Sequence, residues 1–294
     1  MQKKTIEKVI KQKLENWLST ITDKNLAEKV KKDLLVSGGS IASLFLGEQV
    51  NDYDIYLKTV ETAKDLVKYY CKAFPEINIF TFQDKDVELK KFDNVGEDYV
   101  GISKIFFQNL KPEQVKLYLP DLSGFKTQFE DCGEGKYLPV FFSPNAISLS
   151  DQIQIVLRFT GDNEQIHKTF DFVHATNYFT FETGLVTNIS ALESLLTKQL
   201  KYQGSLYPLT SVIRVKKFLK RNWNINAGEQ LKMMFQISEL DLTDFNTLED
   251  QLIGVDVAYF GLLIDSLRSH QESKPDFKLT SAYLNELIDK IFGE

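Results

Sequence analysis

The sequence predicts an α+β protein, with a mixed β-sheet unit followed by an α-helical domain. Short apolar runs of strand character alternate with helical patterns between residues 34 and 190. From about residue 191 onward, apolar side chains recur at spacings of three and four, which is typical of amphipathic helices. We therefore expect N-terminal helices at 1–33, a mixed-sheet unit at 34–190 and a helical domain at 191–294.

Composition indicates a globular chain with a substantial core. The chain has 294 residues, of which 43% are hydrophobic, enough for one large domain or two smaller ones. No run approaches the ~18 consecutive apolar residues of a membrane-spanning helix. The N-terminus is polar and lacks the apolar region of a secretory signal. We expect a cytoplasmic protein with no membrane partner.

Cysteine usage and charge exclude further classes of protein. Cys71 and Cys132 are the only cysteines, so a disulfide framework is not expected. Together with three scattered histidines they show no zinc-site spacing. The formal net charge is −6, which argues against a protein that coats duplex nucleic acid without sequence preference.

The first elements are expected in a regular order. Apolar side chains recur at helical spacing from Ile6 to Leu18, which predicts one or two helices within residues 5–33. The next segment, Leu34–Leu57, predicts a strand, a turn, a helix and a second strand. Its turn and its second strand carry the residues of greatest chemical interest.

A glycine turn comes after the first of these strands. Gly38 and Gly39 allow the backbone to turn sharply and a ligand to approach closely. Ser40 is a suitable N-cap for a helix that ends near Gly47. The N–H groups at such a helix start form an anion-binding site. Gly-Gly-Ser by itself is more often an ordinary loop, so its meaning depends on the chemistry of the neighbouring residues.

A pair of aspartates, Asp52 and Asp54, lies shortly after the glycine turn. They are two residues apart in a run of strand character, so both carboxylates point to the same face. Two like charges side by side repel each other, and magnesium accepts one or two carboxylates together with substrate phosphates. Asp-x-Asp alone occurs on many solvated faces. Its closeness to the glycine turn indicates a site for a nucleoside triphosphate and its magnesium.

The remaining elements of the sheet unit are less regular. The pattern predicts a helix at Val60–Phe74, a strand at Ile77–Phe82, a half-buried strand within Ala146–Phe159 and a short helix at Asn163–Thr169. Between them, residues at about 84–145 mix short apolar runs with acidic and glycine-bearing loops. We interpret this stretch as an insertion that could carry specificity.

The glycine turn and the aspartate pair together resemble the head of the DNA polymerase β-like nucleotidyltransferase superfamily. The spacing is similar to that of poly(A) polymerases and CCA-adding enzymes: Gly38, Gly39, Gly47, Asp52 and Asp54 match their pattern without a gap. The resemblance implies that the mixed-sheet unit is a nucleotidyltransferase head, with the nucleotide bound beside the helical domain.

One departure from this pattern limits the resemblance. The Arg-Asp dipeptide of the CCA-adding pattern is replaced here by Ala42 and Ser43. The departure removes a charged pair and concerns the CCA-adding branch rather than the superfamily. The chain is also similar to uncharacterised phage-encoded nucleotidyltransferase-like proteins.

The superfamily needs a third carboxylate on a neighbouring strand. Asp171 is the best candidate, because it lies between aromatic residues in Phe170–His174, which is expected to be a strand beside Ala146–Phe159. The alternative is an exposed aspartate on an edge strand. Gln154 and Arg158 lie on the polar face of the expected neighbouring strand and could look toward the site.

The resemblance also implies a mechanism. Asp52 and Asp54 would hold two magnesium ions, and Asp171 would help to activate the acceptor hydroxyl. Gly38, Gly39 and Ser40 would cradle the phosphates of a nucleoside triphosphate, whose α-phosphoryl group transfers with loss of pyrophosphate. Positioning and charge neutralisation would supply most of the rate enhancement.

The helical domain offers further candidate nucleotide contacts. Ser205 and Tyr207 lie just before a predicted helix start, although a plain loop between helices is the alternative. Arg214, Lys217 and Arg221 are spaced three and four apart, which places them on one helical stripe. Such a stripe could meet a triphosphate or an RNA backbone, or it could serve only as a solubilising face.

Three functions are compatible with these residues. The first hypothesis is transfer of a nucleotide to an RNA 3′ end, such as that of a tRNA. The second is nucleotidylation of a protein or small molecule, as in toxin-like relatives. The third is a virion or interaction protein that keeps the fold without the chemistry. For a phage-encoded protein, the expected location is the host cytoplasm.

Overall fold

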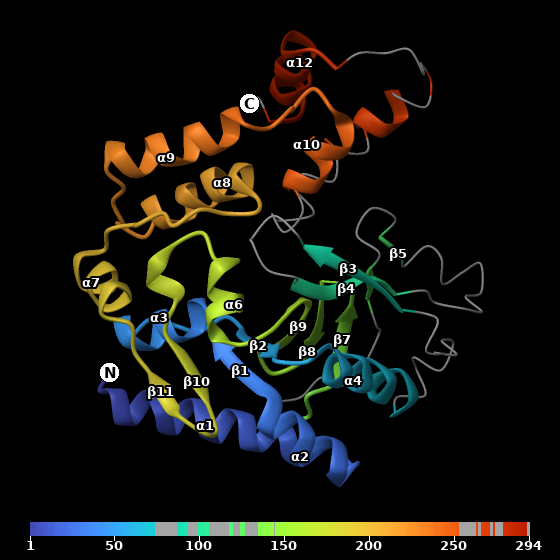
Figure 1. The fold of residues 1–294 in the computed structure, drawn as a ribbon, viewed down its shortest axis with the longest axis vertical. Helices are drawn as coiled ribbons and strands as arrows, with labels where there is room; N and C mark the ends of the chain where they lie inside the picture. Colours follow the sequence, from blue (N-terminus) through green and yellow to red (C-terminus); the bar gives the residue numbers. More distant parts are fainter. Residues whose placement is uncertain are drawn as a thin grey trace. The chain divides into compact units, whose positions relative to one another are not determined.

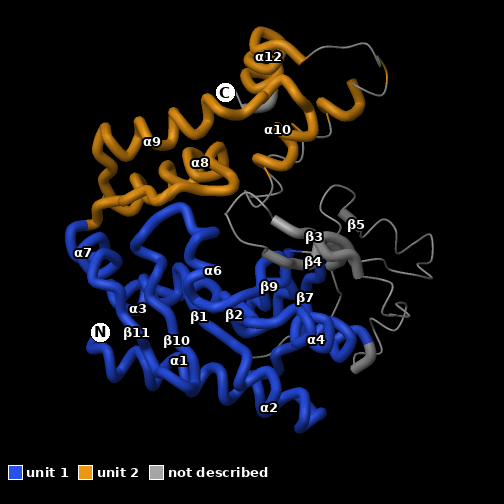
Figure 2. Tube along the Cα trace, in the orientation of Figure 1, with its two compact units in different colours: residues 1–197 blue, residues 198–294 orange. Residues whose placement is uncertain are grey.

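A computed structural model describes residues 1–73, 87–92, 99–105, 118–119, 124–126, 135–143, 145–252, 263, 266–270, 273 and 279–292. The chain forms two compact units, Met1–Thr197 and Lys198–Glu294 (Figure 2).

The first unit contains a sheet with helices on its faces (Figure 1). Its helices in the described residues are α1 (Lys3–Thr20), α2 (Lys24–Asp33), α3 (Gly39–Leu46), α4 (Val60–Ala73), α6 (Asn163–Lys168), the 3₁₀ turn η4 (Val173–Ala175) and α7 (Ile189–Thr197). Its strands are β1 (Leu34–Ser37), β2 (Tyr53–Leu57), β3 (Val87–Phe92), β4 (Tyr99–Ile105), β5 (Tyr118–Leu119), β6 (Gly124–Lys126), β7 (Pro139–Phe142), β8 (Ala146–Leu149), β9 (Ile153–Thr160), β10 (Tyr178–Thr180) and β11 (Gly184–Val186). The predicted order of helix and strand from residue 3 to residue 73 is confirmed.

The described strands form a mixed sheet. Nine of them take the order β11-β10-β1-β2-β9-β8-β7-β6-β5, and β3 pairs with β4 separately. β2 and β9 are parallel, whereas the other neighbours in the large sheet are antiparallel. The α+β fold class is therefore confirmed. The parallel pairing sets Asp54 opposite Gln154, which decides what lies beside the aspartate pair.

The core of the first unit lies on one face of this sheet. Alternate residues of β2 and β9, such as Ile55 and Ile155, are fully buried there against α1 and α4. Trp17 of α1 is fully buried, and its indole N–H donates a hydrogen bond of 2.8 Å to the Tyr70 hydroxyl of α4. Because a buried indole N–H needs an acceptor, this bond ties the N-terminal helix to the core.

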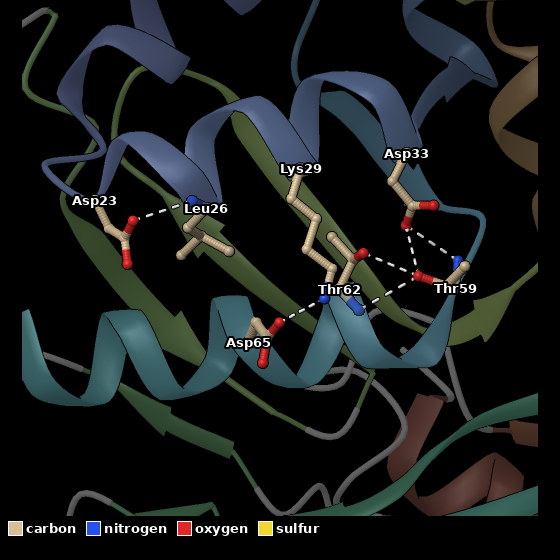
Figure 3. Close-up of polar contacts among 7 residues, drawn as sticks. All are labelled: Asp23, Leu26, Lys29, Asp33, Thr59, Thr62 and Asp65. Atoms are coloured by element: carbon tan, nitrogen blue, oxygen red, sulfur yellow. Dashed lines mark hydrogen bonds and ion pairs between the residues drawn. The ribbon is translucent and has the colours of Figure 1, made fainter.

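Polar contacts join α2 to α4 at the edge of this core (Figure 3). Asp23 caps α2 by accepting hydrogen bonds from the N–H groups of Asn25 and Leu26. At the other end of α2, the Asp33 carboxylate accepts from the Thr59 N–H and hydroxyl. The ion pair of Lys29 with Asp65 measures 2.6 Å, but both side chains are substantially exposed, so it contributes little to stability.

The second unit is helical in its described residues. Its named helices are α8 (Pro208–Leu219), α9 (Ala227–Ser238), α10 (Phe245–Leu252) and α12 (Ser281–Phe292). Leucines of α10 and α12 form its apolar cluster together with Leu263 and Leu267. The prediction of a helical C-terminal part is confirmed for these residues. Among the described residues of both units, no helix combines the length and apolar character that a membrane span requires.

One predicted strand is two strands in the structure, and another lies outside the described residues. The stretch Ala146–Phe159 contains two antiparallel strands, β8 and β9, instead of one. Asp151 and Gln152 form the turn between them with positive φ angles of 59° and 62°. The predicted strand at Ile77–Phe82 and most of the 84–145 stretch lie outside the described residues.

The predicted strand at Phe170–His174 is wrong. Asp171 lies in a bend, and Val173–Ala175 forms the single 3₁₀ turn η4. The physical reason is the pairing within the sheet: both edges of β9 are occupied, by β2 and by β8. No edge of β9 is therefore free for a further strand. The short helix expected at Asn163–Thr169 is confirmed as α6, which begins with a capping box at Asp162.

Candidate functional site

The glycine turn follows β1 where the sequence predicts it, but the predicted N-cap is wrong: Gly38 caps α3, and Ser40 lies within the first turn of the helix. β1 ends at the fully buried Ser37, and Gly38 then adopts φ 97° and ψ −152° as the N-cap of α3. Only glycine tolerates this conformation readily. The Gly38 N–H donates to the Ala175 carbonyl at 3.1 Å, which anchors the turn. A side chain at Gly39 would meet no atom within 4 Å, so there is open space in front of the first turn of α3.

The second strand places a carboxylate against this turn. A Cβ atom at Gly38 would lie 3.1 Å from Oδ2 of Asp54, so the carboxylate passes close to the glycine backbone. Tyr53 and Ile55 point into the core, and Asp54 therefore points to the opposite face of β2. Asp52 precedes the strand by one residue. The structure brings together the glycine turn and the Asp52–Asp54 segment.

Charge and burial distinguish the two aspartates. Asp52 is exposed as a residue, yet partial burial of its carboxyl raises the pKa of Asp52 above its ordinary value. Asp54 is half-buried. Burial therefore disfavours the charged form of the Asp52 carboxyl.

The hydroxyl of Ser40 adds an acceptor or donor at the start of α3. Ser40 is 3% exposed, and its Oγ atom has no hydrogen-bond partner among the residues that the structure describes. A buried hydroxyl without a partner is unfavourable. It lies in the first turn of the helix that Gly38 caps. The N–H groups of that turn favour an anion, and an anion's oxygen would give the Ser40 hydroxyl the partner that it lacks.

The third carboxylate does not join this pair in the described residues. Asp171 is 9% exposed, and it lies in the bend between α6 and η4 rather than on a neighbouring strand. The position opposite Asp54 on β9 is Gln154, an amide whose Nε2 donates to the Ser148 hydroxyl at 3.4 Å. No group of three His, Cys, Asp or Glu side chains in the described part of the chain is arranged to hold a metal ion.

The polar residues expected on the face of β9 separate into two environments. Gln154 pairs with Asp54 in the register of β2 and β9, in agreement with the expectation that the polar face of β9 looks toward the aspartates. Arg158 lies further along β9 and donates to the Asn145 side chain at 3.0 Å. Its guanidinium also lies over the ring of Phe159. Gln154 is thus the β9 side chain placed beside the aspartate pair.

Two residues of this site were not identified from the sequence: Ser37 and His167. The Ser37 hydroxyl lies 2.9 Å from Nε2 of His167, although the two residues are 130 positions apart. The His167 ring packs against Phe170 and Tyr178, with centroid distances of 5.3 Å and 5.7 Å. The local signal in the sequence was Ser37 at the end of the apolar run Leu34–Val36, because a buried hydroxyl there needs a polar partner.

Burial keeps His167 neutral and makes the stability of the fold depend on pH. Desolvation lowers the pKa of His167 from 6.5 to about 4. Between these values the unfolded chain binds the proton and the folded chain does not. The free energy of unfolding should therefore fall by about 2–3 kcal/mol as pH decreases through this window. Chemical denaturation at a series of pH values measures this, and His167→Gln should lose that part of the slope.

The candidate contacts of the helical part belong to the second unit. Pro208 begins α8 as expected, and the Ser205 hydroxyl accepts from the Tyr207 N–H at 2.9 Å. This bond gives Ser205 a local role in the turn before the helix. Arg214 and Lys217 lie on α8, but Arg221 lies beyond its end and packs over Phe218. The roles of Ser205, Tyr207, Arg214 and Lys217 in nucleotide binding remain predictions.

The fold and site together define an α+β protein in which a glycine turn at a helix start lies against an aspartate of the next strand. Solved structures similar to the chain include a Thermotoga maritima CCA-adding enzyme complexed with tRNA. Identity is 14%, the TM-score is 0.37, and the match covers 96% of this chain and 62% of that one. A CCA-adding enzyme with ATP matches with 14% identity and a TM-score of 0.41, over 98% of this chain and 60% of that one.

The family is given by the sequence itself. Residues 8–198 match the family described as Gabija anti-defense 2 family protein, Gad2. The chain therefore belongs to the Gad2 family. It is 22% identical over 282 residues to Gabija anti-defense 2 of Bacillus phage SPbetaL7, a match that covers 95% of this chain and 54% of that protein. The chain thus spans about half the length of this relative.

Proposed function

We propose that this protein is a metal-dependent nucleotidyltransferase that moves a nucleoside monophosphate from a nucleoside triphosphate to an acceptor hydroxyl. The observation that carries the proposal is the approach of the Asp54 carboxylate to Gly38. Oδ2 of Asp54 lies 3.1 Å from the position that a Cβ atom on Gly38 would occupy. This approach sets a carboxylate beside N–H groups at a helix start. Phosphates and a divalent cation need these two features side by side.

The triphosphate would bind at the start of α3. The N–H groups of its first turn would donate to the β- and γ-phosphate oxygens, and the open space at Gly39 leaves room for them. The buried Ser40 hydroxyl would gain a phosphate oxygen as its partner. These contacts hold the α-phosphorus in place for in-line attack by the acceptor oxygen, with pyrophosphate as the leaving group.

Asp52 and Asp54 fit a magnesium site, because both are carboxylates and Asp54 reaches the phosphate cradle. Magnesium, as two ions in the arrangement implied by the resemblance, would supply charge neutralisation at the transferring phosphoryl group. The chain's own residues orient the phosphates and hold the Asp54 carboxylate on the face of β2 that lies against Gly38. The attacking hydroxyl must lose its proton, and a third carboxylate is the group that we expect to assist.

Asp171→Asn tests that assignment. If Asp171 is the third carboxylate, nucleotidyl transfer should fall by roughly a hundredfold or more, because general-base assistance contributes about 10²–10⁴-fold. The melting temperature should stay similar, because asparagine has the same size and shape as aspartate. Full activity of Asp171→Asn would show that another acid acts. Glu88 on β3 would then be tested next, because β3 pairs with β4 and β4 packs against β9, followed by Asp121.

The acceptor in our first hypothesis is an RNA 3′ end, which could belong to a tRNA. The second candidate is the nucleotidylation of a protein or small molecule. The phage relative is named for action against the Gabija defence, and we propose the same role for this chain, in the host cytoplasm. Transfer of a nucleotide onto a component of that defence would be the chemical step by which the protein acts against it.

A transfer assay separates these acceptors. The protein is incubated with Mg²⁺ and each α-labelled nucleoside triphosphate, first with an RNA pool, then with bacterial protein and then with a small-molecule extract. Label in RNA that is lost with Asp54→Asn supports the first hypothesis, and label only in protein or small molecules supports the second. Absence of transfer and of nucleotide binding with all four triphosphates would overturn both and favour a protein that keeps only the fold.

A further inference from the structure

The segment that comes after α6 is tied to the glycine turn by hydrogen bonds. The Gly38 N–H donates to the Ala175 carbonyl at 3.1 Å. The Ser37 hydroxyl lies 2.9 Å from the Asn177 carbonyl and 3.2 Å from the Ala175 carbonyl. His167 reaches the same hydroxyl from the last turn of α6. Residues at the end of β1 are therefore held by a segment far along the chain.

A count of protons assigns the roles within this group. Ser37 carries one hydroxyl proton, and the carbonyls of Ala175 and Asn177 can only accept. If Nε2 of His167 also accepted, three acceptors would compete for one proton. The balanced arrangement has a neutral imidazole with its proton on Nε2. His167 then donates to the Ser37 oxygen, and Ser37 donates to the nearer carbonyl, that of Asn177.

The same imidazole is linked through packed rings to the aspartate strand. His167 packs against Phe170, and Phe170 packs against Tyr56 with a centroid distance of 5.7 Å. Tyr56 lies on β2, on the same face as Asp54. His167 thus contacts Ser37, the residue that leads into the glycine turn. Through Phe170 it is also linked to β2, the strand that carries the Asp54 carboxylate.

We infer that His167 is a positioning residue that fixes the glycine turn relative to the Asp54 strand through its hydrogen bond to Ser37. The inference rests on the proposed function, because its consequence is the affinity for a triphosphate and its magnesium. Phosphate contacts at α3 and metal contacts at β2 act on one ligand, so a small change in their separation weakens both. His167 acts through Ser37 and itself touches neither phosphate nor metal.

Two substitutions at His167 separate the hydrogen bond from ring packing. His167→Phe keeps an aromatic ring and removes the donor, whereas His167→Gln keeps an N–H donor at a similar reach and removes the ring. Ser37→Ala removes the receiving hydroxyl and leaves α6 intact. Ser143→Ala is the matched control, because Ser143 is also a buried serine and its described hydrogen bonds lie within the turn between β7 and β8.

The measurement is calorimetric titration of each protein with α,β-methylene analogues of ATP, CTP, GTP and UTP in the presence of Mg²⁺. For the analogue that the unmodified chain binds best, His167→Phe and Ser37→Ala should each raise Kd by about tenfold, the loss of one hydrogen bond. His167→Gln should stay within about twofold. The double variant of His167→Phe and Ser37→Ala should bind no more than about twofold more weakly than Ser37→Ala alone, because that single variant already lacks the hydroxyl that His167 reaches. Ser143→Ala should bind normally even if its melting temperature falls.

Each contrary outcome has a distinct meaning. If the unmodified chain binds none of the four analogues, the proposed function fails. If the unmodified chain binds one analogue, and Ser37→Ala and His167→Phe bind that analogue as tightly as the unmodified chain does, the proposed function stands and the positioning role is overturned. A loss of affinity in His167→Gln with normal affinity in His167→Phe would assign the effect to ring packing and would overturn the positioning role. Equal losses in the two variants would show that an N–H donor does not restore binding, which would also overturn it. Should His167→Phe fail to fold, Ser37→Ala and His167→Gln decide together: weaker binding in the first with normal binding in the second supports the positioning role, and any other combination overturns it.

Discussion

Replacing Asp54 with asparagine is expected to lower nucleotidyl transfer by roughly a hundredfold to a thousandfold, the cost of removing one group that stabilises developing charge. An amide matches the carboxylate in size, but it is neutral and therefore binds a divalent cation much more weakly. Asp52→Asn should have a comparable effect. Steady-state transfer of α-labelled nucleotide, together with magnesium-dependent nucleotide binding by calorimetry, measures the loss.

Stability should not track activity in these variants. Removing one of two neighbouring like charges relieves repulsion, so the melting temperature should stay similar or rise. Asp65→Asn is the matched control, because it removes an aspartate whose 2.6 Å ion pair with Lys29 is exposed on α4. It should leave both transfer and stability almost unchanged. An Asp54→Asn variant with normal magnesium-dependent transfer would contradict the proposed site.

Gly38→Ala is expected to abolish nucleotide binding and to reduce stability together. A methyl group there must adopt φ 97° and meet Oδ2 of Asp54 at 3.1 Å. The backbone strain costs about 1–3 kcal/mol, and the carboxylate or the turn must shift to relieve the contact. The free energy of unfolding from chemical denaturation and the Kd for a triphosphate with Mg²⁺ report the two effects.

Two other glycines separate the strain from the contact. Gly47 has φ 70° and open space around its Cβ position, so Gly47→Ala should reduce stability and leave nucleotide affinity normal. At Gly39 a Cβ also meets no atom of the chain, yet it would occupy the space proposed for the phosphates. Gly39→Ala should therefore keep the stability and lose affinity. Normal affinity in both Gly38→Ala and Gly39→Ala would place the phosphates elsewhere.

The aspartate pair and the glycine turn could be predicted because their geometry is local. Strand periodicity determines that Asp54 and Tyr53 face opposite sides of β2, and the structure shows this directly. The turn at Gly38 needs a residue without a side chain, which the sequence supplies at the end of an apolar strand. The helical character of the C-terminal part likewise arises from spacings within single segments.

The environment of Asp171 could not be predicted in this way. Its aromatic neighbours have strand propensity, but a strand also needs a free edge, and β9 has none because β2 and β8 occupy both sides. The order of strands depends on pairings between distant segments, which local propensity does not contain. The amide of Gln154 opposite Asp54 is a second consequence of this order.

The sequence by itself thus determined the residues of the phosphate and carboxylate elements, since each depends on backbone geometry over a few positions. Only the tertiary structure decided which side chains surround them. The contact of Ser37 with His167 spans 130 positions, and the approach of Asp54 to Gly38 depends on the pairing of β1 with β2. Such contacts form when whole elements pack to bury the core, so no local pattern in the chain encodes them.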